Sequence, residues 1–483
     1  MMIKKNTLTD SQPASDSASD NIYPLKKPVP TVALKHSTPF GSSLFFTQVT
    51  WLDRWLVRKM LAVVGNPPVR IFLWDGVEAT PPCDTPVAEL VYSDREALIK
   101  TILNPELHWG DLYSNGRVLF AGDMVAFLQT IYQGISRQQK TRSLLRRFVL
   151  WLGNRRIFNS TDRARDNVHH HYDIGNDFYR LWLDTAETQY TCAYFYQPSL
   201  TLEQAQTAKL HYICRKLQLK PGDHVVEAGC GWGGLARFMA KHYGVKVTAY
   251  NISSEQVRYA REQAQQQGLS EQVEYILDDY RNIRGRFDVF VSIGMLEHVG
   301  LADYEHFGKI IRRCLKADGR GLIHSIGKVI QAPMNAWIER RIFPGAYAPT
   351  LSEMMKIFEP NNLAVQDVEN LRLHYARTLT CWFERFNQHK QAITEMMDDE
   401  FVRAWTLYLA GSISSFNVGE LQLFQIVFTH LENNQLPASR CYMYQEEWQN
   451  NTVITPAKSP LYKPVATNKV LLNIVREEKN ETD

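Results

Sequence analysis

A run of glycines after a short apolar segment is the first pattern in the sequence that could serve chemistry. The segment HVVEAGC leads directly into Gly229, Gly231, Gly233 and Gly234, and a helix-like segment follows. Glycine lets the backbone turn sharply and approach a ligand closely. Because three of these glycines fit the spacing G-x-G-x-x-G, a dinucleotide site has to be considered.

The residues around this turn favour a different kind of nucleoside cofactor. A dinucleotide site places a carboxylate on the ribose about 20 positions further on, where this sequence has Tyr250, Asn251 and Ile252. Asn251 can still hydrogen-bond a hydroxyl group, and Glu227, just before the glycines, can orient the loop or meet a cationic ligand. A positively charged nucleoside cofactor therefore fits better than an anionic pyrophosphate. A purely structural strand-to-helix turn is the alternative.

Further segments contain reactive or polar residues, and each has an ordinary explanation when taken alone. These segments are HHHYDIGNDFYRLWL with YTCAYF, SIGMLEHVG, GLIHSIGK and HYARTLTCWFERF. His169 to His171 could bind a metal, but adjacent histidines point apart, so a solvated or capping role fits better. Cys192 could fill the core, as buried free cysteines do, and Glu297 could cap a helix.

Alternating strands and helices are expected to position these residues. Strand-like segments occupy residues 224–230, 245–252, 273–279, 287–295 and 319–327, and helix-like segments occupy residues 233–244, 253–268 and 304–319. Ser253 and Ser254 are candidate caps of the second helix. This alternation predicts an α/β fold with a doubly wound parallel sheet. Residues 383–431 are expected to be mostly helical and are rich in aromatic side chains.

The chain divides into four expected regions. Residues 1–40 are rich in Ser, Asp, Pro and Lys and are expected to be disordered. Residues 41–155 are expected to form a small N-terminal α/β domain, in which residues 94–103 are helical and residues 69–76 and 88–93 are strands. Residues 156–440 form the expected catalytic domain, and residues 441–483 a polar tail.

The N-terminal domain is expected to end in a basic amphipathic helix at residues 136–159. This segment has no acidic residue, and apolar side chains lie between its cations, which are Arg137, Lys140, Arg142, Arg146, Arg147, Arg155 and Arg156. Such a helix suits an anionic membrane surface. The alternative is a solvated basic face between domains.

Composition excludes several classes of protein. A chain of 483 residues with 45% hydrophobic and 22% charged residues can bury more than one core. The net charge of +3 gives no indication of nucleic-acid binding, and seven scattered cysteines without a C-x-x-C pair disfavour a disulfide scaffold or a structural zinc site. No apolar run is long enough for a transmembrane helix, and none follows the first lysines as in a secretory signal. We therefore expect a reduced, cytoplasmic protein.

Taken together, the segments from His169 to His430 resemble the cyclopropane-fatty-acyl-phospholipid synthase family, which includes the mycolic acid methyltransferases. The strongest blocks are EAGCGWGG, NISSEQ, SIGMLEHVG and YTCAY. The resemblance implies a class I, Rossmann-like methyltransferase fold and S-adenosylmethionine as cofactor. The N-terminal region also resembles the extra domain of bacterial synthases, through which family members often dimerise, so a homodimer is implied.

The resemblance assigns a set of cofactor-binding residues. Tyr190 and Thr191 would touch the methionine end, where Thr191 replaces the more usual serine but keeps the hydroxyl group. Asn251 and Gln256 would reach the ribose. The remaining expected residues are Glu227, Gly229, Gly231 and Gly233 at the turn, and Asp279 and Tyr280 beside the adenine.

The implied reaction adds a methylene group to a cis double bond of an unsaturated phospholipid chain. Methyl transfer leaves a carbocation, which aromatic faces can stabilise; candidate wall residues are Tyr172, Phe178, Tyr194, Phe195 and Trp382. In the family a bicarbonate ion then removes a proton from the new methyl group. The matching residues that would hold this ion are Cys192, Glu297, His324, the Ile326 backbone and Tyr375. An acyl substrate in an anionic membrane implies peripheral association with its inner face.

Four other functions compete with this interpretation. A related methyltransferase could stop before ring closure and leave a methyl- or methylene-branched chain. A small-molecule N- or O-methyltransferase would need a general base for a heteroatom and no lipid-docking surface. A non-catalytic binding protein should have lost site residues, and none is lost; a dehydrogenase is supported by the glycine spacing alone.

Overall fold

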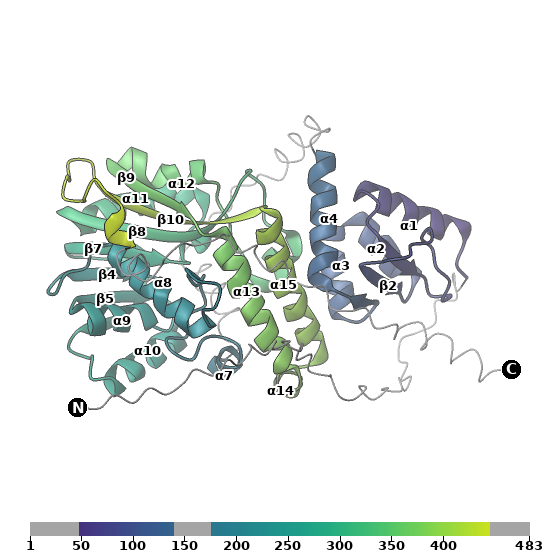
Figure 1. Cartoon of the computed structure of the whole chain (residues 1–483), viewed down its shortest axis with the longest axis horizontal. Coiled ribbons are helices and arrows are strands. Elements are labelled where there is room, and N and C mark those ends of the chain that lie inside the picture. The colour runs from purple at the N-terminus through teal and green to yellow at the C-terminus, as the bar shows by residue number, and fades with distance from the viewer. Residues whose placement is uncertain (1–47, 140–174, 445–483) are drawn as a thin grey trace, which may run out of the picture. The chain divides into compact units, whose positions relative to one another are not determined.

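The computed structural model of the protein describes residues 48–139 and 175–444 (Figure 1). Several expectations fall outside these ranges: the segment 1–40, residues 140–159 of the basic segment, the histidines at 169–171 with Tyr172, and the tail beyond residue 444. The boundary expected at residues 155 and 156 also lies outside the described residues. Residues 136–139 are described and form the end of a helix.

The N-terminal part contains a three-stranded sheet with helices, as expected for a small α/β domain. Its strands follow the order β1-β2-β3, with β1 and β2 parallel and β2 and β3 antiparallel. The helix predicted at residues 94–103 begins at Arg95, because the Asp94 side chain accepts a hydrogen bond from the Ala97 amide and caps it. The elements are α1 (Trp51–Val63), β1 (Val69–Phe72), β2 (Ala88–Tyr92), α2 (Arg95–Leu103), α3 (Pro105–Ser114), β3 (Val118–Gly122) and α4 (Met124–Gln139).

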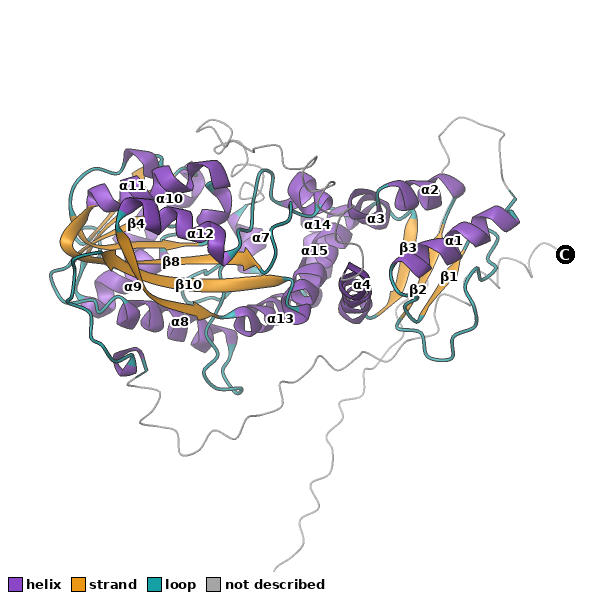
Figure 2. Cartoon of the chain, turned by 90° about the horizontal axis from the view of Figure 1, so that it is seen from above, coloured by secondary structure: helices purple, strands orange, loops and turns teal. Residues whose placement is uncertain are grey.

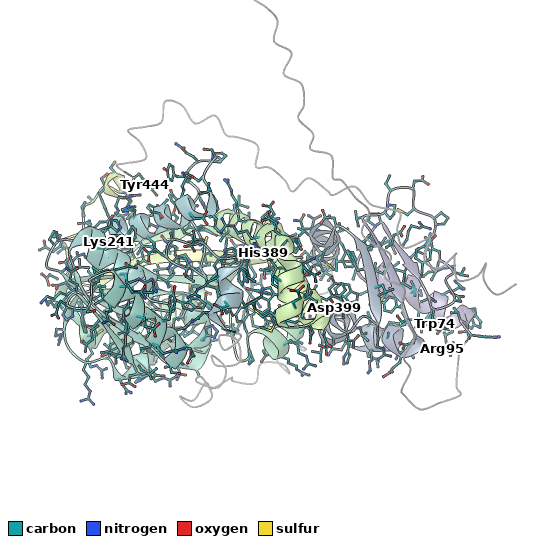
Figure 3. All side chains as sticks on the ribbon, turned by 90° about the horizontal axis from the view of Figure 1, so that it is seen from below. Trp74, Arg95, Lys241, His389, Asp399 and Tyr444 are labelled. Carbon is teal, nitrogen blue, oxygen red and sulfur yellow. The ribbon has the colours of Figure 1, made fainter. Side chains whose placement is uncertain are left out.

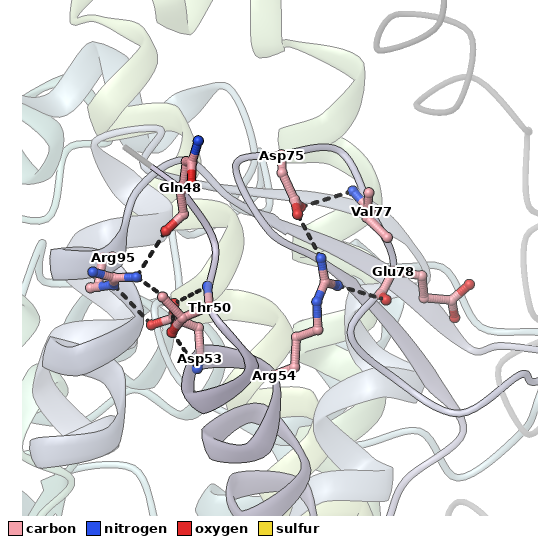
Figure 4. Close-up of polar contacts among 8 residues, drawn as sticks. All are labelled: Gln48, Thr50, Asp53, Arg54, Asp75, Val77, Glu78 and Arg95. Carbon is pink, nitrogen blue, oxygen red and sulfur yellow. Dashed lines mark hydrogen bonds and ion pairs between the residues drawn. The ribbon is translucent and has the colours of Figure 1, made fainter. Parts of the chain in front are cut away.

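A buried carboxylate connects the start of α1 to α2 (Figure 4). Thr50 and Asp53 form a capping box, in which each side chain bonds the other residue's backbone amide. Arg95 donates two hydrogen bonds to Asp53, of 2.9 and 2.6 Å, and a third to the Gln48 carbonyl. Only 3% of Asp53 is exposed, so this bidentate pair fixes the orientation of α1.

The catalytic part is built on a seven-stranded sheet with the order β6-β5-β4-β7-β8-β10-β9. Strands β4, β5, β6, β7 and β8 are parallel, whereas β10 runs antiparallel to both of its neighbours. The strands are β4 (His224–Ala228), β5 (Lys246–Asn251), β6 (Val273–Leu277), β7 (Phe287–Ile293), β8 (Leu315–Lys328), β9 (Leu363–Asn370) and β10 (Leu421–His430).

Helices cover both faces of this sheet, so the doubly wound arrangement is confirmed (Figure 2). One buried cluster joins the sheet to α8 (Leu202–Lys216), α9 (Gly234–Tyr243) and α10 (Ser254–Gln266). A second cluster on the other face joins it to α11 (Tyr304–Cys314) and α12 (Leu351–Phe358). Of the two candidate caps of α10, Ser253 is the residue that accepts the hydrogen bond, from the Gln256 amide.

Three details of the expected sheet were wrong. The sheet is not wholly parallel, since β10 is antiparallel. Residues 421–430 form that strand rather than a helix, because a continuous apolar segment buried on both faces has no period that distinguishes the two. The helix at 304–319 ends at Cys314, because residue 315 already pairs with Phe287 as the start of β8.

Two long helices pack against each other beside the sheet: α13 (Arg372–Gln388) and α15 (Asp399–Val418), with α14 (Lys390–Met396) between them. His389 lies between α13 and α14, and Asp399 begins α15 (Figure 3). Helices α3 and α4 contact α15, where Ser414 Oγ donates a 3.0 Å hydrogen bond to the Val125 carbonyl. A short helix, α7 (Asn176–Arg180), starts the catalytic part. No helix in the described residues is long and apolar enough to cross a membrane.

Candidate active site

A cavity of about 1100 Å³, open solvent at its mouth included, lies at the carboxyl ends of β4, β5 and β7. In a doubly wound sheet, ligands bind at this edge. Nine of the ten predicted cofactor-binding residues line the cavity, and Gly233 does not. The nine are Tyr190, Thr191, Glu227, Gly229, Gly231, Asn251, Gln256, Asp279 and Tyr280.

The glycine turn shapes the floor of this cavity. Gly229, Gly231 and Gly233 have φ angles of +82°, +52° and +76°, which residues with a side chain rarely adopt. A Cβ on Gly229 would lie 2.8 Å from the Cβ of Met295. Gly233 instead packs under Tyr275, whose hydroxyl donates to the Gly233 carbonyl at 2.8 Å. Gly233 therefore supports the turn from behind.

Asn251 connects the turn to α10. Its amide nitrogen donates to the Gly231 carbonyl at 3.0 Å and to Gln256 Oε1 at 2.9 Å. Its oxygen accepts from the Ser253 amide. Gln256 Nε2 has no hydrogen-bond partner and is buried, so it is available as a donor to a hydroxyl of a bound ligand.

Thr191 and Glu227, which also line the cavity, lie close to a buried lysine that the sequence analysis did not single out. Lys209, on α8, donates hydrogen bonds to Gln189 Oε1 at 2.6 Å and to Thr191 Oγ1 at 2.9 Å. The lysine is fully buried, and Glu227 is 2% exposed. Glu227 Oε2 has no partner, which leaves a buried acceptor for a hydroxyl or an ammonium group.

Burial controls the ionisation of these two groups. It raises the pKa of Glu227 to about 8, although Lys209 and Arg237 oppose the shift. It lowers the pKa of Lys209 to about 8, although Asp184, Cys192 and Glu227 oppose this shift. At neutral pH the lysine is cationic and Glu227 is mainly protonated, so a cationic ligand would favour ionisation of Glu227. An unpaired acceptor and an unpaired donor thus fit the amino-acid end and the ribose of S-adenosylmethionine.

Three of the residues assigned to the base lie together after β7 and at the end of β8. Glu297 lies in a short 3-10 helix (Leu296–His298) and its Oε1 accepts a 2.6 Å hydrogen bond from the Ile326 amide. Glu297 Oε2 and His324 Nε2 are buried and have no partner. Burial raises the pKa of Glu297 to about 7, with the Ile326 amide opposing. Burial and the charges of Lys209 and Lys216 lower the pKa of His324 well below its usual value, so its imidazole is neutral.

Cys192 and Tyr375 approach the same edge of the sheet from other segments. Both contact the backbone of Leu371: the Cys192 thiol lies 3.9 Å from its carbonyl oxygen, which also accepts from the Tyr375 amide. Leu371 donates to the carbonyl of Leu423, which pairs with Ile326 across β8 and β10. Burial raises the pKa of the Cys192 thiol, so Cys192 is a neutral donor. Backbone contacts through Leu371 and Leu423 thus connect Cys192 and Tyr375 to Ile326 on β8. None of the five residues assigned to the base lines the cavity at the glycine turn.

The aromatic residues predicted to form a wall pack against different partners in the structure. Trp382 has ring centroids 5.3 Å from Tyr190 and 6.0 Å from Tyr375, between the cavity and the base residues. Phe178 packs on Trp405 with centroids 5.0 Å apart, in an aromatic core. Tyr194 stacks on Tyr212, and Phe195 lies under the Arg377 guanidinium. Trp382 therefore contacts one residue of the cavity and one residue assigned to the base, and its role as a wall residue stays a prediction. Tyr172 lies outside the described residues.

Lys209 was missed because the helix containing it was not predicted, and a lysine in a helix is ordinarily solvated. Its signal was the spacing within α8: Ala205, Lys209 and Tyr212 recur at helical intervals among buried residues. A charged residue at a position that the helical spacing assigns to the core, 15 residues before the strand that leads into the glycine turn, could have identified it.

Comparisons with known proteins show which family the chain belongs to. Residues 159–426 match the family model described as mycolic acid cyclopropane synthetase. The chain is 38% identical over 295 residues to the cyclopropane-fatty-acyl-phospholipid synthase of Escherichia coli K12, covering 60% of this chain and 75% of that protein. It is 33% identical over 374 residues to a protein of Pseudomonas putida named "Probable fatty acid methyltransferase", covering 74% of this chain and 91% of that one.

A solved structure has the same catalytic fold. The mycolic acid cyclopropane synthase CmaA1, complexed with SAH and CTAB, is 29% identical, with a TM-score of 0.52, and the match covers 55% of this chain and 97% of that one. The family match, the methyltransferase fold and the cavity at the glycine turn agree. The chain belongs to the mycolic acid cyclopropane synthetase family and is an S-adenosylmethionine-dependent methyltransferase.

Proposed function

We propose that this enzyme adds a methylene group to the cis double bond of an unsaturated phospholipid acyl chain and closes a cyclopropane ring. The observation that carries the proposal is the pair of buried atoms without partners, Glu297 Oε2 and His324 Nε2, at the sheet edge that also holds the cofactor cavity. Buried polar atoms are normally paired. Two such atoms, one on Glu297 after β7 and one on His324 in β8, could serve a small oxyanion that Cys192 and Tyr375 would also contact.

The cofactor, when bound, supplies an electrophilic methyl group on a sulfonium centre. Glu227 and Gln256 would hold its polar ends, and the glycine turn would let it approach the sheet. The alkene carbon attacks the methyl group, the C–S bond breaks, and a carbocation forms on the neighbouring carbon. Trp382, whose ring contacts those of Tyr190 and Tyr375, would face that cation, and its apolar surroundings would exclude water.

Ring closure requires a proton to leave the new methyl group. We assign bicarbonate as the base, because a protein carboxylate beside the cation would be alkylated. Glu297, held by the Ile326 amide, would accept from the ion's hydroxyl, and His324, Tyr375 and Cys192 would donate to its oxygens. Held by these residues, the ion would supply the base for the proton of the new methyl group, and the electron pair of the broken C–H bond would form the third bond of the ring.

A second candidate function is transfer of the methyl group without ring closure. The similarity to the "Probable fatty acid methyltransferase" of Pseudomonas putida favours it. Loss of a proton from a neighbouring carbon would then give a methylene-branched chain, and a saturated methyl-branched chain would need a hydride from a separate reduced cofactor as well. The base residues favour ring closure, because an enzyme that stops earlier has less need of a base at the new methyl group.

Access to a bilayer substrate is part of the proposal. We propose that the enzyme is cytoplasmic and associates with the inner face of the membrane through the basic segment at residues 136–159, whose arginines suit anionic head groups. Dimerisation through the N-terminal domain, separate from the catalytic domain, is proposed from the family resemblance. Co-sedimentation with anionic liposomes tests the docking. Unchanged binding after charge reversal at Arg146 and Arg147 would contradict it.

One product assay separates the candidate reactions. The purified enzyme is incubated with S-adenosylmethionine and vesicles of a cis-monounsaturated phospholipid, and the acyl chains are analysed by mass spectrometry. Ring closure predicts a gain of one CH2 and loss of double-bond reactivity. The same gain with a retained alkene would establish methylation without a ring. No gain, in the presence of cofactor binding, would contradict a phospholipid acceptor.

A further inference from the structure

A chain of buried side chains extends from His324 away from the cavity. Gln425 on β10 lies directly opposite His324 on β8 in the strand register. Its Nε2 atom is 3.1 Å from His324 Nδ1, and its Oε1 atom is 2.8 Å from Lys216 Nζ on α8. Gln425 and Lys216 are fully buried, and His324 is 1% exposed. Burying such a set of polar side chains destabilises the fold unless every member has a hydrogen-bond partner.

The far end of this chain is also paired. Lys216 Nζ donates to Glu369 Oε2 on β9, and the Tyr212 hydroxyl donates to the same oxygen at 2.8 Å. The Lys216 ammonium group lies 4.4 Å from the centroid of the Tyr212 ring. Glu369 and Tyr212 therefore hold the Lys216 ammonium group in one place, from which it donates a hydrogen bond to Gln425.

The chemistry of the donors fixes the protons along the chain. A lysine ammonium group can only donate, so the atom of Gln425 that faces it is the amide oxygen. The amide NH2 group consequently faces His324 and donates to Nδ1. Because Nδ1 accepts, the single proton of the neutral ring is on Nε2, the atom that has no partner in the structure.

We propose that Gln425 and Lys216 are positioning residues that hold His324 in the tautomer with its proton on Nε2, directed as a donor toward the base site. The other tautomer would present a lone pair on Nε2 to an anion and repel it. The effect on the reaction rests on the proposed function, whereas the tautomer itself does not. Neither Gln425 nor Lys216 lines the cofactor cavity. Substitution of either residue is therefore expected to leave the affinity for the cofactor unchanged.

The decisive variant is Gln425→Glu, which keeps the size of the side chain and the contact with Lys216. A carboxylate can only accept, so it draws the imidazole proton to Nδ1 and leaves Nε2 as an acceptor. Gln425→Met removes the donor without adding charge and should populate both tautomers. The matched control is Gln422→Glu on the same strand, where Gln422 bonds Asn370 and Gly419 rather than His324.

Two readouts are needed. Nitrogen-15 NMR of the full-length, histidine-labelled enzyme reports which ring nitrogen carries the proton, with His324→Gln used to assign the signal. Release of S-adenosylhomocysteine, with vesicles of cis-monounsaturated phosphatidylglycerol, gives kcat and the KM for S-adenosylmethionine. For Gln425→Glu we expect the proton on Nδ1, a fall in kcat of about 10- to 100-fold, and a KM for the cofactor within about twofold of wild type. Gln425→Met should have a kcat between those of Gln425→Glu and wild type. Gln422→Glu should match wild type in both tautomer and kcat.

A wild-type proton on Nδ1 would overturn the inference, as would Gln425→Glu moving the proton without lowering kcat. A fall in kcat with no change of tautomer would also overturn it, since the damage would then be merely structural. An alkene retained in the wild-type product would count against ring closure alone, because the NMR result reports on His324 whatever the product.

Discussion

The ammonium group of Lys209 lies 2.9 Å from the hydroxyl of Thr191, inside the fold and directly behind the cofactor cavity. A second hydrogen bond, of 2.6 Å, ties the same ammonium group to Gln189. Both partners belong to the segment 188–191, which lines the cavity. The lysine therefore fixes this segment from behind, where it touches no solvent.

Loss of this contact should weaken cofactor binding. A hydrogen bond to a charged group contributes about 1.5–3 kcal/mol, which corresponds to a factor of at least about 10. Lys209→Met and Thr191→Val are each expected to raise the Kd for S-adenosylhomocysteine about tenfold in isothermal titration calorimetry. Thr191→Ser keeps the hydroxyl group and should stay within about twofold of wild type. If Lys209 and Thr191 act through their mutual hydrogen bond, the double variant should raise the Kd little more than either single variant does. Additive losses of binding free energy would show that the two residues act separately.

Cofactor binding should release a proton, through Glu227. Burial raises the pKa of this carboxyl group to about 8, so it is mainly protonated in the free enzyme at pH 7. A cationic ligand beside it favours the carboxylate and lowers the pKa, so binding at pH 7 should release about one proton per cofactor. Calorimetry in two buffers that differ in ionisation enthalpy measures this number. Glu227→Gln should abolish the release, and a release that persists in that variant would assign the proton to another group.

The sheet could be predicted from the sequence wherever strand and helix alternate with clear periods, as from β4 to β8. The last two strands of the chain, β9 and β10, could not be predicted. Leu421–His430 is buried on both faces and has no alternation, so its sequence fits a buried helix equally well. Its antiparallel direction depends on tertiary pairing with β8 and β9, which no local pattern reveals.

The candidate site divides in a similar way. Glu227 and the glycine turn could be identified because they adjoin one strand and one turn. Lys209 and Gln425 act from a helix and a strand whose identity was not predicted, and their roles depend on burial and on partners far away in sequence. A buried lysine in a sequence looks like a solvated one until the fold shows what surrounds it.

A side chain at Gly229 should disturb the cavity floor, and Gly222 provides a control that separates this effect from backbone strain. Gly222 and Gly229 have nearly equal φ angles, +89° and +82°, so alanine causes similar backbone strain at both. A Cβ at Gly222 meets nothing within 4 Å, whereas a Cβ at Gly229 lies 2.8 Å from Met295 at the cavity floor. Gly222→Ala should lower the melting temperature and leave the Kd for S-adenosylhomocysteine unchanged. Gly229→Ala should in addition raise that Kd about tenfold or more, and equal Kd values for the two variants would contradict the role of the turn.

Asp53 should stabilise the N-terminal domain in a pH-dependent way. Burial raises the pKa of this carboxyl group, but hydrogen bonds from Arg95 and Thr50 outweigh burial and lower it below its usual value of 3.8. A lowered pKa means that the stabilisation is present above the unfolded value, near pH 4, and is lost as the pH falls through the folded one. Asp53→Asn leaves Arg95 with an uncompensated charge and should cost about 3 kcal/mol in the free energy of unfolding.

The neighbouring pair in Figure 4 provides the control for that measurement. Arg54 and Asp75 are joined at 2.6 Å, but their side chains are 25% and 29% exposed. Because water screens such a pair, Arg54→Gln should cost only about 0.5 kcal/mol. Urea unfolding at pH 7, followed by tryptophan fluorescence, compares the two variants. At pH 3 the difference between wild type and Asp53→Asn should shrink, since this pH lies below the unfolded value of 3.8 and the carboxyl group of the unfolded wild type takes up a proton. A difference that is the same at both pH values would mean that the carboxylate charge has no part in holding α1.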